Sequence, residues 1–233
     1  MTDWDSNRTI NHRKTTLAFA VGLVDVFTGG QPDDDDVTVE LASEHATPVR
    51  NPSGYYVFVN LDADEVTVVV DADDRYRDER RTVRLSSSEA EPADAPDGTH
   101  VVTDPSVALM IELTPTPAYP FPRSATVVRG HVETADGDPV AGAQVSLREF
   151  DPVVETTETG EYALWVPATG EDVQRREGRN VVVVGGNADN GRALADGDGT
   201  DPTLVVDHPD YDEVTERVAV DAGTKTVHYV TVG

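Results

Sequence analysis

Residues 126–150 read TVVRGHVETADGDPVAGAQVSLREF, and this stretch decides the expected fold. Its apolar residues come in short runs rich in Val, which are typical of strands rather than helices. Gly137 permits a tight hairpin turn after the first run, and Pro139 begins the return. Ala143, Val145 and Leu147 then alternate, so their side chains point to one face. The stretch therefore predicts two β-strands joined through a turn.

Similar runs recur along the whole chain, while helical periodicity is nearly absent. They are rich in Val and Thr and are bounded by Gly, Pro, Asp or Asn. Evenly spaced strands with turn signals between them favour β-sandwiches over alternating strands and helices, so we expect an all-β protein. The expected strands are 16–24, 37–41, 55–60, 65–70, 81–85, 106–113, 126–133, 143–150, 160–166, 180–185, 203–206, 213–220 and 226–232.

A proline-rich segment divides the chain. Pro115, Pro117, Pro120 and Pro122 favour an extended conformation, and none of them can donate a backbone N–H to a ladder. Polar stretches at 86–104 and 185–202 are expected to be long loops. The expected organisation is a flexible N-terminal arm at 1–14, a first β-sandwich at 15–114, a linker at 115–125 and a second β-sandwich at 126–233.

Two segments, one in each half, follow a common order. Residues 66–85 read VTVVVDADDRYRDERRTVRL, and residues 203–220 read TLVVDHPDYDEVTERVAV. Each contains an apolar strand, an aspartate, an Asp-rich turn, a tyrosine and a closing strand. The agreement indicates one pattern used twice, with each half closing its own core.

The second half carries a family resemblance. Residues 129–147 resemble the opening of a carboxypeptidase-regulatory-like domain, and residues 156–164, TTETGEYAL, are similar to its signature of turn, glycine, aromatic residue and strand. The first half is less similar, because Asp33–Asp36 stand where the second half has its Pro-Val-x-Gly-Ala element. The resemblance implies two tandem Ig-like or prealbumin-like (transthyretin-like) β-sandwich domains. Such modules serve as spacers, adhesive units or appendages to catalytic domains, so no activity comes with the fold.

The arrangement also resembles accessory proteins of phage-tail-like contractile injection particles. The features are the segment LVDVFTG at 23–29, the YPFP hinge at 119–122, and two modules without a recognisable signal peptide. This resemblance implies a baseplate, cap or fibre-attachment component. Such a component would assemble in the cytoplasm and end in a released or envelope-associated particle.

The charge of the chain is strongly negative. Its 44 Asp and Glu residues against 18 Lys and Arg residues give a net charge of -26, and Lys14 and Lys225 are the only lysines. Such a surface repels phosphates and anionic lipids, so nucleic acid and membranes are not expected partners. The balance resembles that of cytosolic proteins from extreme halophiles, notably haloarchaea, whose charge repulsion concentrated salt screens. The alternative is an ordinary acidic protein of a high-GC organism.

Catalytic motifs are absent from the sequence. Without cysteine, neither disulfides nor thiolate chemistry is available. No Gly-x-Ser-x-Gly and no His-Glu-x-x-His occurs, and His131 and His228 lie in strand patterns. The many carboxylates are expected to form a hydrated surface. We nominate no catalytic residue and expect no enzyme.

Calcium is the one ligand that the sequence suggests. Residues 196–201 read DGDGTD, so that Asp196, Asp198 and Asp201 would offer oxygen ligands on a glycine-rich loop. The order of an EF-hand is not met, because Asp201 stands where its glycine is required. The alternative is a surface loop that attracts cations loosely.

Arginines form the only basic cluster, at 75, 77, 80, 81 and 84. Arg75, Arg77 and Arg81 are candidates for contact with a protein partner, since arginine is favoured at interfaces. Tyr119 and Phe121 of the proline-rich segment are further candidates. The alternatives are pairing of the arginines with neighbouring acids and packing of the two rings onto the modules.

Two classes of function remain open. The first is a non-enzymatic structural or assembly protein that acts through contacts with other protein subunits. The alternative is a carbohydrate or surface-polymer binding module. Sugar binding generally requires exposed aromatic rings, and of the two tryptophans Trp165 is expected to be packed rather than exposed.

Overall fold

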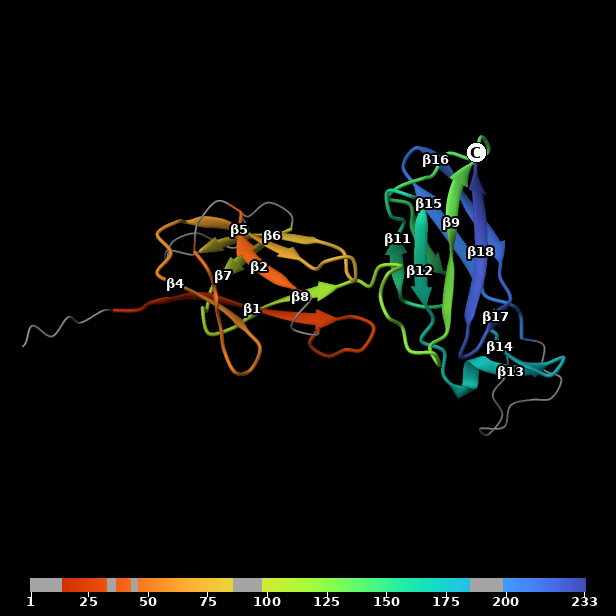
Figure 1. Cartoon of the computed structure of the whole chain (residues 1–233), viewed down its shortest axis with the longest axis horizontal. Helices are drawn as coiled ribbons and strands as arrows, with labels where there is room; N and C mark the ends of the chain where they lie inside the picture. Colours follow the sequence, from red (N-terminus) through yellow and green to blue (C-terminus); the bar gives the residue numbers. More distant parts are fainter. Residues whose placement is uncertain (1–13, 33–36, 43–45, 86–97, 185–198) are drawn as a thin grey trace, which may run out of the picture. The chain divides into compact units, whose positions relative to one another are not determined.

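The computed structural model describes residues 14–32, 37–42, 46–85, 98–184 and 199–233. Regular structure in these ranges is β-strand, apart from a short 3-10 helix, η3 (Gly170–Asp172) (Figure 1). The expected all-β class is therefore confirmed. Within these same ranges, no helix is long and apolar enough to span a membrane.

The chain divides into two compact units. The first comprises residues up to Val24 with Gly30–Asp71 and Asp78–Leu113, and the second comprises Asp25–Gly29, Ala72–Arg77 and Thr114–Gly233. The proline-rich segment 115–125 is thus part of the second unit. The expected domain boundaries stay a prediction.

The first unit contains two four-stranded sheets, with strand orders β3-β4-β1-β8 and β2-β5-β6-β7. Phe19 and Phe58 stack with ring centroids 4.8 Å apart, and Val68, Val83 and Ile111 are fully buried. Alternation of buried and exposed positions, clearest in β5, turns one face of each sheet to the core. The strands are β1 (Leu17–Asp25), β2 (Thr38–Leu41), β3 (Val49–Arg50), β4 (Tyr56–Val59), β5 (Glu65–Asp71), β6 (Glu79–Leu85), β7 (Thr99–Val102) and β8 (Leu109–Leu113).

The second unit contains three sheets, with strand orders β12-β9-β18, β11-β10-β15-β16 and β13-β14-β17. Tyr162, Leu164, Val145 and Leu204 are fully buried in its core. The strands are β9 (Val127–Thr134), β10 (Gln144–Leu147), β11 (Val153–Glu155), β12 (Glu161–Trp165), β13 (Val173–Arg176), β14 (Arg179–Val182), β15 (Thr203–His208), β16 (Tyr211–Arg217), β17 (Val220–Asp221) and β18 (Lys225–Val232).

The two units share a topology. The order β4-β1-β8 in the first corresponds to β12-β9-β18 in the second, and β2-β5-β6 corresponds to β10-β15-β16. β18 pairs parallel to β9, and Figure 1 draws β1 and β8 with arrows in the same direction. The segments 66–85 and 203–220, which share a sequence order, form the antiparallel pairs β5–β6 and β15–β16. The repeat expected from the sequence is therefore present as a repeat of strand order.

The stretch 126–150 forms its two strands, but they lie in different sheets. Gly137, at a φ of 86°, makes the tight turn, and its N–H donates to the Thr134 carbonyl at 2.9 Å. The return pairs with β9 only through the isolated bridge between Glu133 and Pro139. β10 then pairs with β11 and β15 in the other sheet. The turn chemistry was predictable, whereas the change of sheet was not.

Gly130 allows close approach inside the β9–β18 pair. A Cβ at this position would lie 1.6 Å from the carbonyl oxygen of His228 and 2.8 Å from the Tyr162 hydroxyl. That hydroxyl donates a 2.9 Å hydrogen bond to the same carbonyl. Burial, and then the charge of Glu216, raises the pKa of Tyr162, so it remains a donor at neutral pH.

Some expectations about elements were wrong. β7 lies inside the stretch 86–104 that was expected to be a loop, and it pairs parallel to β6. The expected strand 213–220 is divided, since β16 ends at Arg217 and β17 pairs with β14 in a different sheet. The short strands β3, β11 and β13 were not predicted. The expected arm at 1–14, except Lys14, and most of the loop 185–202 lie outside the described residues.

Candidate functional site

A buried carboxylate is the most connected polar group described in the second unit. Asp25, at the end of β1, is only 2% exposed. Its Oδ1 accepts the N–H groups of Phe27 at 2.8 Å and Thr28 at 3.3 Å. Its Oδ2 accepts the hydroxyls of Tyr119 at 2.7 Å and Tyr76 at 3.2 Å. We call Asp25, Tyr76 and Tyr119 the carboxylate–tyrosine cluster.

Local sequence explains how Asp25 is held. The segment Asp25–Gly29 turns sharply, with the Gly29 N–H donating to the Asp25 carbonyl at 2.8 Å and Gly29 at a φ of 69°. Aspartate commonly bonds backbone N–H groups just after it in such turns. The turn supplies two of the four donors, so the cost of burying the carboxylate is offset largely by hydrogen bonds.

The Tyr119 hydroxyl remains a protonated donor. Burial, and next the hydrogen bond to Asp25 and its negative charge, raises the pKa of Tyr119 far above its ordinary value. A neutral hydroxyl is therefore the stable form throughout the physiological range.

Aromatic rings surround the cluster. Phe27 meets the rings of Tyr119, Phe121 and Trp165 edge-on, with centroids 5.7, 5.1 and 6.4 Å apart. The Tyr119 ring also contacts the rings of Phe121 and Tyr76, with centroids 4.7 and 5.4 Å away. Edge-to-face contacts of this kind add to the stabilisation from buried apolar area. The cluster is therefore a packed core rather than an open site.

Arg129 covers one side of this core. Its guanidinium lies 5.6 Å from the centre of the Phe121 ring and donates to the carbonyl of Pro117 at 2.9 Å and of Tyr119 at 3.5 Å. Its buried Nε has no hydrogen-bond partner among the described residues. Because the Arg129 guanidinium stacks on this ring and binds both carbonyls, it holds the proline-rich segment against β9.

The two aromatic candidates for partner contact face inward. Tyr119 is 9% exposed and Phe121 is 5% exposed. Both rings are occupied by contacts within the second unit, so they offer little surface to another subunit. The alternative reading, packing within the protein, describes their positions.

The arginine candidates are engaged with neighbouring groups. Arg77 forms an ion pair with Glu155 in the second unit, and Arg81 pairs with Glu79 in β6 at 2.7 Å. The Arg75 carbonyl accepts the Thr116 N–H at 2.9 Å, beside the proline-rich segment. Exposed ion pairs of this type contribute little stability. Their proposed role in contacts stays a prediction.

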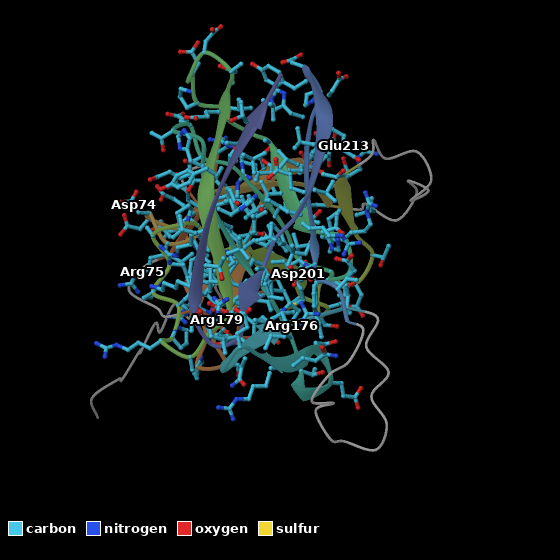
Figure 2. All side chains as sticks on the ribbon, turned by 90° about the vertical axis from the view of Figure 1, so that its right-hand side faces the viewer. Asp74, Arg75, Arg176, Arg179, Asp201 and Glu213 are labelled. Carbon is cyan, nitrogen blue, oxygen red and sulfur yellow. The ribbon has the colours of Figure 1, made fainter. Side chains whose placement is uncertain are left out.

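The structure describes only one of the three candidate calcium ligands. Asp196 and Asp198 lie outside the described residues, whereas Asp201 is described. Its Oδ1 accepts a hydrogen bond from Arg176 at 2.9 Å, and Arg176 also donates to the Gly199 carbonyl (Figure 2). A calcium ion at Asp201 would have to compete with this guanidinium. Throughout the ranges that the structure covers, no group of three His, Cys, Asp or Glu residues is placed to hold a metal ion.

The described histidines do not form a nucleophile–base pair. The Nε2 of His228 lies 2.8 Å from Glu216 Oε2, and the His208 ring lies tilted against the Tyr211 ring with centroids 5.2 Å apart. His131 lies on β9 beside the turn at Gly160. Each therefore has a structural neighbour rather than a serine or threonine to activate.

A shallow hollow is present in the first unit. It encloses about 210 Å³ that is partly open to solvent, and its lining includes Leu23, Gln31, Arg50 and Tyr56. Among the described residues that line it, Arg50 is the only ionisable one apart from the tyrosine, and it lies over the Tyr56 ring at 5.5 Å. The hollow lacks the convergent polar groups that a ligand pocket requires.

The fold and this buried cluster define a chain of two β-sandwich units that share one strand order. No known protein family model matches the chain, and no curated protein matches it in sequence. The resemblance to carboxypeptidase-regulatory-like domains therefore stays a prediction.

Solved structures show only weak likeness. The Bacillus anthracis TIE protein aligns at 8% identity with a TM-score of 0.26, and a Streptococcal ancillary pilin aligns at 13% with a TM-score of 0.27. Both alignments cover 94% of this chain, which spans 34% and 62% of those two proteins. A C-terminal fragment of the pilus adhesin SpaC from Lactobacillus rhamnosus GG aligns at 10% identity over 92% of this chain and 97% of its own, with a TM-score of 0.24. Scores this low carry no inference about function.

Proposed function

We propose that this chain is a non-enzymatic structural protein that joins other protein subunits in a larger assembly. The observation that carries the proposal is the saturation of Asp25. Four donors occupy the buried carboxylate, and aromatic rings fill the space around it. A catalytic base needs a free lone pair and room for a substrate, and this cluster offers neither.

Function in such a protein lies on the outer surfaces. The cores of the two units hold strand faces and loops in fixed positions, as modules used for spacing and attachment do. The acidic surface would bind basic patches of partner subunits and keep the free chain soluble. Partners are therefore expected to be proteins, with neither nucleic acid nor membrane among them.

The specific form that we propose is a baseplate, cap or fibre-attachment part of a phage-tail-like contractile injection particle from a halophilic organism. The sequence resemblance described above is what supports it. Assembly would take place in the cytoplasm, and the finished particle would be released or held at the envelope.

Co-sedimentation tests this proposal. Native lysate, prepared at the salt concentration of the source cells, is separated by ultracentrifugation, and the pellet is examined for this chain together with sheath and tube proteins. The proposal expects the chain in the particle fraction, with release when the particle is dissociated. A chain that stays wholly in the supernatant contradicts membership in such a particle.

A glycan array tests the alternative of a sugar-binding module. Trp165 gives this alternative little support, since it is 8% exposed and packs on Phe27. Trp4 lies outside the described residues. Specific binding to one class of glycan would favour adhesion over assembly.

A further inference from the structure

Strand β18 is an exposed edge of the second unit. It closes the order β12-β9-β18, so β9 is its only ladder partner among the described strands. Its odd-numbered residues, from Lys225 to Thr231, point outward, while Val230 and Val232 are buried. Figure 2 views the second unit from the side on which β18, drawn in violet, lies at the front.

The outward face of β18 is unusually apolar. Val227 is 62% exposed and Tyr229 is 69% exposed, the highest value among the large hydrophobic residues described. Scattered exposed residues are ordinary in soluble proteins. Here, however, the two are neighbours on one face of a regular eight-residue edge strand. Edges of this kind are templates for pairing with another strand unless the sequence protects them.

The acid content of β18 differs from that of the edge strand in the neighbouring sheet. β18 reads KTVHYVTV and contains no Asp or Glu, in a chain that has 44 of them. The edge strand β16 of the neighbouring sheet reads YDEVTER and carries three acids. Charged residues on an edge hinder pairing, and β18 carries only Lys225, at its first position, so the rest of the strand is open to docking.

We propose that β18 pairs antiparallel with β18 of a second copy of this chain. Charge argues for this occupant. A basic partner would be attracted to the acid-rich remainder of the surface, whereas an acidic partner meets less repulsion along a strand that contributes no carboxylate of its own. With a net charge of -26, a second copy is such a partner. The proposal does not depend on the assembly in which the protein works.

The geometry of the strand sets the register. A two-fold axis perpendicular to the sheet places the outward-facing residues of both copies on the same face of the joined sheet. An outward residue of one copy must therefore lie opposite an odd-numbered residue of the other. Centring the axis on Tyr229 places this ring opposite its symmetry mate and Val227 opposite Thr231 of the second copy. Both exposed apolar side chains then have cross-strand partners. The sheet continues as β12-β9-β18 in one copy and β18-β9-β12 in the other.

Salt should govern the strength of this pairing. A contact through one strand is small compared with standard stable interfaces, so the dimer is expected to be weak. The net charge of each copy, and the acids of the adjacent β16, repel the second copy at low ionic strength. Since the Debye length falls from about 10 Å at 0.1 M to about 3 Å at 1 M salt, association should strengthen in concentrated salt.

Cysteine trapping tests both the pairing and its register. The chain has no cysteine, so Tyr229→Cys introduces a single thiol that faces its own mate across the axis. Val227→Cys lies roughly 13 Å along the strand from its own mate, at about 3.3 Å per residue, which is too far for a disulfide. It faces Thr231 instead. Under mild oxidation in concentrated salt, we expect cross-linking of Tyr229→Cys alone and of Val227→Cys mixed with Thr231→Cys.

The control is a matched exposed valine in the first unit. Val107 is 63% exposed, so Val107→Cys reports random collision of equally accessible thiols. Cross-linking of Tyr229→Cys no faster than this control overturns the proposal. Equal cross-linking of Tyr229→Cys and Val227→Cys overturns the register centred on Tyr229.

Sedimentation of the full chain gives an independent readout. In concentrated salt we expect a reversible monomer–dimer equilibrium, weakened about tenfold or more by Tyr229→Asp, because two carboxylates then face each other. Val107→Asp adds the same charge elsewhere and should leave the equilibrium nearly unchanged. A purely monomeric mass for the unmodified chain at every protein and salt concentration refutes the inference.

Discussion

Removal of one hydroxyl, in Tyr119→Phe, tests the structural role of the carboxylate–tyrosine cluster. The substitution keeps the ring and its contacts with Phe27 and Phe121, and removes the hydroxyl that donates the 2.7 Å hydrogen bond to Asp25. A hydrogen bond to a charged group contributes about 1.5–3 kcal/mol when it is buried. We therefore expect the free energy of unfolding to fall by about 2 kcal/mol at pH 7. Tyr76→Phe, which removes the longer 3.2 Å bond, should cost less.

Alkaline pH should remove the difference in stability between the wild-type chain and Tyr119→Phe. Because the folded pKa of Tyr119 is raised, its contribution is complete below the unfolded pKa of about 10 and is lost as pH rises toward the folded value. Above pH 10 the wild-type chain loses about 1.4 kcal/mol per pH unit through this group, a loss that Tyr119→Phe does not suffer. The two proteins should then become equally stable near pH 11.5, within roughly half a unit.

Trp165 reports on the cluster directly, since it packs on Phe27 with ring centroids 6.4 Å apart. In a Trp4→Phe background it is the only tryptophan, so its fluorescence follows urea unfolding of the second unit. The full chain is required, because this unit includes Asp25–Gly29 and Ala72–Arg77. A loss below about 0.5 kcal/mol at pH 7, or a difference that persists unchanged above pH 11, would refute the role given to Tyr119.

Three further results are expected. Gly130→Ala should cost about 3 kcal/mol or more, because its Cβ would lie 1.6 Å from the His228 carbonyl oxygen, whereas Gly170→Ala meets nothing within 4 Å and should be nearly neutral in the same urea titration. Thr156→Val should cost about 1–3 kcal/mol, since the buried hydroxyl donates to the Val140 carbonyl at 2.6 Å and accepts the Ala143 N–H at 2.9 Å; a neutral result by calorimetry would contradict this. The melting temperature should rise by about 5 °C or more between 0.1 M and 2 M KCl as the net charge is screened, and a flat or falling profile would speak against a halophilic fold.

Long alternating strands were predictable from the sequence, because burial on one face leaves a period of two. β5, with buried Val66, Val68 and Val70, shows this pattern and was expected within a residue of its observed bounds. β7 was missed because Thr99–Val102 is short and follows a polar stretch, and its partner β6 is remote from it in sequence. β13, which reads VQRR, has one buried residue and no alternation of apolar residues. Tertiary pairing, rather than local propensity, makes such segments strands.

The carboxylate–tyrosine cluster could not be found from the sequence, because its members carry no local sign of their meeting. Asp25 is one acid among 44, Tyr76 lies in an Asp-rich turn, and Tyr119 lies between prolines. The only available signal was the position of Asp25, at the end of a nine-residue strand and two residues before Phe27, where an aspartate often caps a turn.

In a chain so rich in acids, the presence of one more carboxylate on the surface says little about function. A buried carboxylate, or an exposed strand without any, is more informative. Asp25 is unusual because it is buried, and hydrogen-bond donors surround it. β18 is unusual for the opposite reason, because it is exposed and contains no acid. Burial of an acid needs a structural reason, and so does the exclusion of acids from an open edge. The first reason lies within the second unit, where four donors meet Asp25. The second is best sought outside the chain, in a neighbouring copy that a carboxylate would repel.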